Sequence, residues 1–485
     1  MRRVLPILHM LGLVVLIFAF TMLLPLAMAF IWRDAAQSAY DEAFLITFTV
    51  GLLTWLFTRH SRRELQTRDG FLLVVLVWAA LPAFAALPLL FYFPGISFTD
   101  AYFETTSGLS TTGATVLVGL DSLPHSINLW RCFLNWLGGM GIIVLAVAIL
   151  PLLGIGGRQL FKAETPGPMK DSKLTPRIAD TAKSLWLVYA AITLACIVAL
   201  KLAGMSWFDA VCHAFAAMGL GGFSTYDASV GYFNSPAIEA VLIVFMLIAA
   251  MNFATHFLAY RNRSLNAYRA DPEVLPMLVL VVLSCIGGAL YIWHAGTYPG
   301  YWTALRHVSF NLVSLATDCG FASADFNQWP IFVPLWMLFL SCVTVSSGST
   351  GGGIKMIRSL LMFKQSQREL QRQIHPAAVL QIKLLGAPVS NQVVFAVQVF
   401  VMLYVCSILA LTMVLVASGL DFISAFSAII ACINNAGPGL NQVGPATNYS
   451  VLTDFQTWVC SFTMLLGRLE MMTVFVLFTR TFWRA

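Results

Sequence analysis

Charged side chains are scarce in this chain of 485 residues: Asp, Glu, Lys and Arg make up 10% of it, whereas hydrophobic residues make up 59%. Soluble globular domains carry about 25% charged residues. The mean hydropathy is strongly positive. The lack of charge therefore excludes a soluble globular protein and predicts an all-α polytopic membrane protein.

Sequence motifs typical of metal binding or catalysis are also missing. The chain has no CxxC spacing, and no constellation of His, Ser, Cys or carboxylates typical of an active site stands out, so we expect no enzyme. Reduced cysteine packs as a small hydrophobic residue. We therefore expect buried packing, and no redox role, for the nine cysteines at 132, 196, 212, 285, 319, 342, 406, 432 and 460.

Long apolar runs predict ten membrane spans. The first, from Val4 to Trp32, is much longer than a signal-peptide core, and we expect it to be retained. The other nine predicted spans are residues 42–58, 71–93, 127–153, 184–204, 237–260, 274–294, 331–363, 392–418 and 455–480.

Basic residues gather on one side of these spans. Alternate connecting segments hold 23 of the 28 Lys and Arg but only eight of the 22 Asp and Glu: 1–3, 59–69, 154–183, 261–273, 355–391 and 480–485. Positive charge marks cytoplasmic loops. The sequence thus predicts that both termini are cytoplasmic, and that part of this charge serves docking of a regulator or of anionic lipids.

Four short, half-apolar stretches on the other side share one register, and each ends at a glycine. Each glycine follows a helical marker by 13 residues, and the glycines recur at intervals of 109, 98 and 117 residues. The marker–glycine pairs are Asp100–Gly113, Asp209–Gly222, His307–Gly320 and Ser424–Gly437. This pattern indicates a fourfold repeat of span, half-helix, glycine turn and span. The predicted units are 1–68 (two extra spans), then repeats 69–165, 166–270, 271–390 and 391–485.

Every repeat begins and ends inside, so the four are parallel and related about an axis along the membrane normal. Irregular backbone at membrane depth lines water or is buried in protein. The turns therefore predict a pore, in which half-helix ends and carbonyl oxygens replace part of a cation's hydration shell. Ordinary helix C-caps remain an alternative for single glycines, as does N-capping for Asp100 and Asp209. The predicted filter residues are Thr111, Thr112, Gly113, Leu220, Gly221, Gly222, Asp318, Cys319, Gly320, Asn435, Ala436 and Gly437.

The stretch SSGSTGGGIKM resembles a phosphate loop, but Ile354 separates its last glycine from the lysine, Met356 follows the lysine and a membrane span precedes it. The nucleotide-binding interpretation therefore fails. Interior glycines each cost a helix about 1 kcal/mol, so the run predicts a broken helix at membrane depth. We interpret it as a gate below the filter; a packing kink is the alternative. The predicted gate residues are Ser346, Ser347, Gly348, Ser349, Thr350, Gly351, Gly352, Gly353 and Lys355.

Arg468 is the second outlier, because it lies roughly 20 Å into the last span at ~1.5 Å per residue. A charge at this depth faces a cavity or a partner. Glu470 lies two positions on, so the two do not share a helix face. A positive barrier in the pore and an interhelical ion pair are the two interpretations of Arg468.

The motifs STTGAT, LGGFST, TDCGFA and NNAGPG resemble the four filter segments of the Trk/Ktr/HKT superfamily of potassium transporters, and within it the bacterial TrkH family. The resemblance covers the whole chain. It implies a potassium-selective pore in the bacterial inner membrane, with K+ as the transported ion, a homodimer and a cytosolic TrkA-type nucleotide-binding regulatory subunit. It also implies that Arg468 lies beneath the filter. The glycine at position 113 favours potassium, since some sodium-transporting relatives have serine there.

A different class of transporter stays open from sequence alone. Broken helices at a midplane site are also typical of ion-coupled secondary transporters, of an organic solute or of a cation with protons. No inverted pair of repeats is apparent, which favours the pore. The sequence predicts no nucleic-acid partner, and the only other partner it requires is the lipid bilayer.

Overall fold

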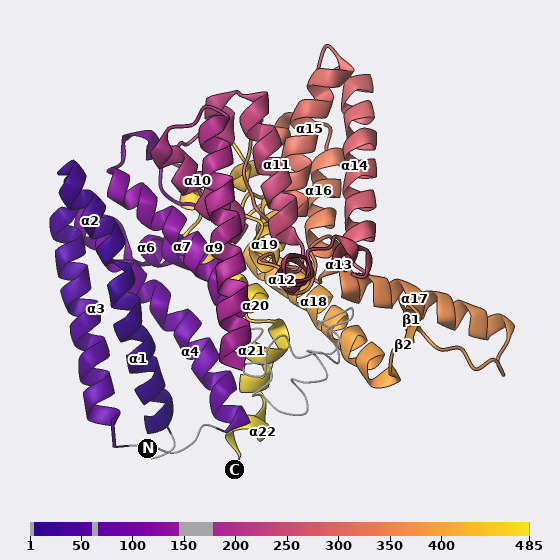
Figure 1. Ribbon diagram of the computed structural model, residues 1–485, viewed down its shortest axis with the longest axis horizontal. Helices are drawn as coiled ribbons and strands as arrows, with labels where there is room; N and C mark the ends of the chain where they lie inside the picture. Colours follow the sequence, from indigo (N-terminus) through magenta and orange to yellow (C-terminus); the bar gives the residue numbers. More distant parts are fainter. Residues whose placement is uncertain (1–3, 61–65, 145–177, 485) are drawn as a thin grey trace.

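The computed structural model describes residues 4–60, 66–144 and 178–484, and these residues are mostly helical (Figure 1). Some predictions fall wholly or partly outside the described residues: the end of the span at 127–153, the repeat boundary at 165/166, and all or part of the basic segments 1–3, 59–69, 154–183 and 480–485. Both described ends of the chain lie at the same end of the molecule (Figure 1).

The N-terminal hairpin precedes the repeats and lies at one edge of the bundle (Figure 1). Its helices are α1 (Leu5–Thr21), α2 (Leu23–Trp32) and α3 (Gln37–Thr58). α1 and α2 together make one span. The hairpin packs tightly because glycines face backbone: a β-carbon placed on Gly12 would lie 2.8 Å from the Trp55 nitrogen. Small residues at such crossings allow close helix contact in membranes.

Four units follow, each with a long helix, a short helix, a turn and then a further helix or a broken pair of helices. Unit 1 consists of α4 (Thr67–Ala85), α5 (Leu87–Tyr92), α6 (Phe98–Leu109), η1 (Leu120–Ser122) and α7 (His125–Val144). Unit 2 consists of α9 (Ile178–Leu202), α10 (Trp207–Gly219), η5 (Ser229–Phe233), α11 (Pro236–Ala250), α12 (Phe253–Asn262) and α13 (Asn266–Arg269). Unit 3 consists of α14 (Val274–His294), α15 (Tyr301–Ala316), η6 (Phe326–Gln328), α16 (Phe332–Val343), α17 (Met356–Ile374) and the hairpin of β1 (Lys383–Leu384) and β2 (Ala387–Pro388). Unit 4 consists of α18 (Asn391–Ala417), α19 (Phe422–Asn434), η7 (Asn441–Val443), η8 (Tyr449–Val451), α20 (Asp454–Arg468), α21 (Met471–Leu477) and α22 (Arg480–Trp483).

The short helices α6, α10 and α19 begin with the same chemistry. The Ser97 hydroxyl accepts the amide hydrogen of Asp100 at 3.0 Å, and Ser206 and Asp421 accept equivalently from residues 209 and 424. Such side-chain caps satisfy one of the amides left unpaired at a helix start. Asp100 and Asp209 are therefore not the caps themselves, as one interpretation held; they occupy the third helical position and accept from the capping serines.

Among the described residues, six helical segments are long and apolar enough to cross a membrane, and two further pairs of helices reach that length only together, across a sharp bend. The pair α11 and α12 bends by 95°, and α20 and α21 bend by 112°. The segments predicted as spans at 237–260 and 455–480 are thus each interrupted by a sharp bend. The span predicted at 331–363 breaks between α16 and α17, as the glycine run had indicated.

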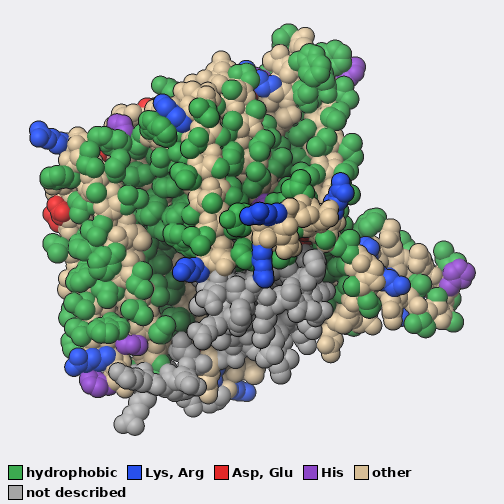
Figure 2. Space-filling view, in the orientation of Figure 1, with side chains coloured by type: hydrophobic (Ala, Val, Ile, Leu, Met, Phe, Trp, Pro, Cys, Tyr) green, Lys and Arg blue, Asp and Glu red, His purple; other side chains and the backbone are tan. Residues whose placement is uncertain are grey.

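The outside of the bundle is apolar, as a lipid-facing surface requires. Hydrophobic side chains cover most of the face shown in Figure 2, and the few charged ones lie mainly toward helix ends. Large apolar residues such as Phe57 and Leu202 are more than 80% exposed. Seven cysteines are buried, but Cys342 is only partly so and Cys406 is exposed on α18, so the expectation of buried packing is wrong for Cys406.

Candidate functional site

The four predicted glycine turns have the same backbone conformation. The glycines have φ values of 85°, 65°, 88° and 86° at positions 113, 222, 320 and 437. The residue two positions earlier is also left-handed each time, with φ of 54°, 53°, 62° and 58° at Thr111, Leu220, Asp318 and Asn435. Left-handed non-glycine residues are uncommon and strained. Their recurrence at one offset shows that the four turns are structural equivalents.

Hydrogen bonds repeat with the same register. In each turn the amide of the residue before the glycine donates to the carbonyl five positions earlier in the short helix, which ties the turn under the helix end. These bonds are Thr112 to Ser107 (2.8 Å), Gly221 to Ala216 (2.9 Å), Cys319 to Ser314 (2.8 Å) and Ala436 to Ala431 (2.8 Å). These four equivalent bonds hold the turns in the same position beneath the ends of the short helices.

The four turns close into a ring. A β-carbon placed on any of the glycines would lie within 3.0 Å of the carbonyl oxygen that precedes the next glycine around the ring. The contacts run in cyclic order: Gly113 meets Gly221, Gly222 meets Cys319, Gly320 meets Ala436, and Gly437 meets Thr112. The backbones approach too closely for any larger residue, which is the setting where glycine is required. All twelve predicted filter residues therefore lie in one assembled site.

A cavity of about 80 Å³ lies against this ring, on the side toward which the chain leaves the glycines. Gly113, Gly222, Gly320 and Pro438 line this cavity, together with polar residues such as Asp227. Converging carbonyl oxygens at the negative ends of short helices are chemistry that suits a partly dehydrated cation. The ring and its cavity thus resemble a filter with a vestibule.

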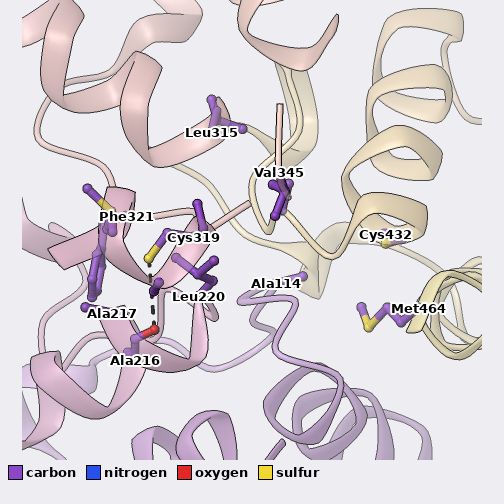
Figure 3. Packing of buried hydrophobic residues seen from close by; sticks show 14 of the residues in the cluster. Ala114, Ala216, Ala217, Leu220, Leu315, Cys319, Phe321, Val345, Cys432 and Met464 are labelled. Carbon is purple, nitrogen blue, oxygen red and sulfur yellow. Dashed lines mark hydrogen bonds between the residues drawn. The ribbon is translucent and has the colours of Figure 1, made fainter. Parts of the chain in front are cut away.

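The unusual side chains of the third turn point away from the ring. The Cys319 sulfur lies 4.0 Å from the Ala216 carbonyl of α10 (Figure 3). The Asp318 carboxylate accepts the amide hydrogen of Gly352 at 3.1 Å, below the turn. Both residues therefore contribute backbone to the ring, and their side chains join it to neighbouring elements.

A buried ion pair supports the ring, and the sequence reasoning missed it. The Arg131 guanidinium donates to Glu104 at 2.8 Å and to the Ser224 carbonyl at 3.0 Å; both charged side chains are 1% exposed. Glu104 also accepts from the Val116 amide at 2.9 Å. The pair thus binds together the chain segments that leave the first and second turns. Charged residues inside an apolar half-helix and a span were the signal that could have found them.

The intramembrane loop, residues 344–355, lies beneath the ring. Its ends are tied together, because Ile354 donates to the Cys342 carbonyl and Met356 to the Val345 carbonyl, both at 2.8 Å. The Lys355 ammonium donates to the Gly351 carbonyl at 2.6 Å, inside the loop. All predicted gate residues of the run 346–353 belong to this loop, and most of them are buried.

The tip of the loop contacts the inner ends of the short helices. The Thr350 hydroxyl donates to the Met218 carbonyl of α10 at 3.0 Å. A β-carbon on Gly352 would lie within 3.0 Å of the Asn434 carbonyl, at the end of α19. Together with the bond to Asp318, these contacts place the loop against units 2, 3 and 4.

Arg468 completes the contact with unit 1. The guanidinium donates to the Thr350 carbonyl of the loop at 2.7 Å and to the Gly138 carbonyl of α7 at 3.0 Å. It is 2% exposed and sits at the bend between α20 and α21. Glu470 pairs instead with Arg358 of α17 at 2.9 Å. Arg468 therefore binds backbone carbonyls in these contacts, and the interpretation as an interhelical ion pair applies to Glu470.

Comparisons with known proteins agree with this architecture. A protein family described as "TrkH: Cation transport protein" matches residues 36–484. The Trk system potassium uptake protein TrkH of Salmonella typhimurium is 46% identical over 474 residues, which cover 98% of each chain. Its counterpart from Vibrio parahaemolyticus is 46% identical over 482 residues, covering 99% of each chain.

A solved structure matches as well. The crystal structure of the potassium transporter TrkH from Vibrio parahaemolyticus superposes with a TM-score of 0.91 at 44% sequence identity and covers 99% of each chain. Family match, sequence identity and fold agree along the whole length. This chain therefore belongs to the TrkH family of cation transport proteins.

Proposed function

We propose that this chain forms the membrane pore of a potassium uptake system, with the ring of four glycine turns as its selectivity filter. The observation that carries the proposal is the cyclic contact of each glycine with the next carbonyl, which gathers four oxygens around one centre. Such oxygens replace the hydration shell of a monovalent cation. The names of the relatives, which are potassium uptake proteins, support potassium as the ion.

The proposal assigns gating to the intramembrane loop and Arg468. Their contacts with all four units directly beneath the ring support this role, since a plug there obstructs any ion that leaves the filter. The buried guanidinium adds a positive charge that repels cations. A packing kink needs no such contacts with four separate units.

Partners follow from the same assignment. We place the chain in the bacterial inner membrane as a homodimer, with both termini cytoplasmic and a cytosolic TrkA-type nucleotide-binding subunit that controls the gate. The relatives are named as parts of a Trk system, which supports further subunits. The basic segments on the predicted cytoplasmic side offer positive charge for docking.

Rubidium uptake into liposomes that contain only the purified chain tests this function. With a potassium gradient and a clamped potential, but no proton or sodium gradient, uptake is expected to follow the voltage, and organic solutes are expected not to compete. Empty liposomes are the control. Uptake that requires a proton gradient would indicate a symporter instead of a pore. Competition by an organic solute would indicate a secondary transporter.

A further inference from the structure

Glu273 is a buried carboxylate outside the filter that contacts both flanks of the intramembrane loop. It precedes α14 and is 0% exposed. One of its oxygens, Oε1, accepts the amide hydrogen of Ser347 at 3.0 Å and that of Ile357 at 2.9 Å. These two residues are ten positions apart and bracket the glycine run. A single side-chain atom therefore closes the base of the loop.

The contact with Ile357 also provides an acceptor for one of the first backbone amides of α17. The first amides of a helix lack partners within the helix. The side chain of the N-cap residue, Lys355, does not supply one here. Glu273 takes that position from another element of unit 3, and a carboxyl oxygen at a helix start interacts favourably with the helix dipole.

The first part of the loop, from Ser346 to Gly348, is also bound by the bend between α11 and α12. Ser346 donates to the Ala250 carbonyl at 3.0 Å, and Phe253 donates to the Gly348 carbonyl at 3.1 Å. The bend exposes these backbone groups, and the loop satisfies them. Glu273 is linked to the same region through Asp271, which accepts from the Glu273 amide at 3.0 Å and from the Thr255 hydroxyl of α12 at 2.7 Å.

We propose that Glu273 is a positioning residue that holds the intramembrane loop in its pore-closing conformation by accepting both flanking amides. The inference rests on the proposed role of the loop as a gate. Loss of the acceptor leaves two buried amides unpaired in the closed state only, so it shifts the equilibrium toward a displaced loop. The residue touches neither the ring nor the loop tip, and it acts through the loop base.

The chemistry of the site makes a glutamine substitution informative. Burial, followed by the nearby Asp271 carboxylate, raises the pKa of Glu273, whereas the hydrogen bonds from Ser347 and Ile357 lower it. Glutamine keeps an acceptor oxygen on a side chain of the same length without the charge. Alanine removes the acceptor, and aspartate withdraws it by one methylene group.

Rubidium uptake by the full chain in liposomes tests the inference. Glu273→Ala is expected to raise the initial rate about tenfold, which corresponds to about 1.4 kcal/mol, whereas Glu273→Gln stays within about twofold of the unchanged chain. In a chain lacking residues 346–353, Glu273→Ala is expected to add nothing, a result that a merely structural role would not produce. Glu239→Ala is the matched control, because it removes another buried carboxylate, bound to Arg306 at 2.7 Å and outside the loop.

Size-exclusion profiles and melting temperatures check that the variants fold, and Glu273→Asp, also expected to raise the rate, replaces Glu273→Ala if the latter does not. Unchanged uptake in a folded Ala or Asp variant would overturn the inference, and so would equal uptake by the Gln and Ala variants. If deletion of the loop raises uptake while these substitutions do not, only the role of Glu273 fails. If the deletion itself leaves uptake unchanged, the gate fails with it.

Discussion

Gly113 is constrained by its own backbone angle and by its neighbour in the ring. Its φ is 85°, and a β-carbon would collide with the Gly221 carbonyl. Gly113→Ala is therefore expected to reduce rubidium uptake about tenfold or more, because the side chain pushes one carbonyl out of the ring and the left-handed conformation costs about 1–2 kcal/mol. Flux into liposomes measures this effect.

Gly119→Ala separates backbone strain from damage to the ring. Gly119 also has a left-handed φ, 71°, but the nearest atom to an added β-carbon is the Ser122 hydroxyl at 3.5 Å. This control is expected to keep uptake near that of the unchanged chain. Similar losses in both variants would mean that strain alone, without the ring contact, explains the effect at Gly113.

Arg468 connects the intramembrane loop to α7 by donating hydrogen bonds to one backbone carbonyl in each. Arg468→Ala is expected to raise uptake several-fold to tenfold, because both bonds to the loop and α7 are lost and so is the positive charge, at about 1 kcal/mol or more per bond. Arg468→Lys keeps the charge but loses the forked geometry, and we expect an intermediate rate. A folded Arg468→Ala protein with an unchanged rate would argue against the barrier.

Substitution of Arg131 tests how much the buried Arg131–Glu104 ion pair beside the ring contributes to stability. Arg131→Met leaves Glu104 buried without its ion-pair partner, and breaking such a pair costs about 3–5 kcal/mol. We expect a clear fall in melting temperature in detergent. Arg306→Met at the Glu239 pair, where the arginine side chain is 28% exposed, is expected to cost less. An equal fall in both variants would show that burial of the pair is not decisive.

At the scale of elements, the intramembrane loop depends on glycine at its tip. A β-carbon on Gly352 would collide with the Asn434 carbonyl, whereas one on Gly287 of α14 meets nothing within 4 Å. Gly352→Ala is therefore expected to displace the loop and raise uptake several-fold, which corresponds to a loss of about 1 kcal/mol in the free energy that favours the closed position of the loop. Gly287→Ala is expected to leave the rate unchanged. Reduced uptake in the Gly352 variant would show instead that the loop supports an open path.

The sequence predicted those elements whose signals are local. The four turns share one register, and the glycine run breaks its own helix, so both could be located without coordinates. The bends after α11 and α20 could not, because Met251 and Glu470 at the breaks are not helix breakers. Ser346 donates to the Ala250 carbonyl next to the first break, and Arg358 pairs with Glu470 at the second, so both partners come from another unit of the chain.

At the scale of the whole molecule, the four units share one orientation around the ring, and both described chain ends lie on the side of the intramembrane loop (Figure 1). The distribution of Lys and Arg in the sequence predicts that both chain ends, and with them this side, are cytoplasmic. The vestibule then faces outward, and an ion that enters from outside meets the filter before the loop. The orientation of the membrane protein thus decides whether the proposed gate controls exit into the cell.

Single cysteines on the two faces test this orientation. Ser366 on α17 and Ala446 between η7 and η8 are both exposed, and Cys406→Ser removes the exposed native thiol. We expect a membrane-impermeant maleimide to label Ser366→Cys only in inverted vesicles and Ala446→Cys only in right-side-out vesicles. The opposite pattern would place the basic face outside, where the loop would guard entry to the filter instead of exit from it, and a cytosolic subunit would have no access to the gate.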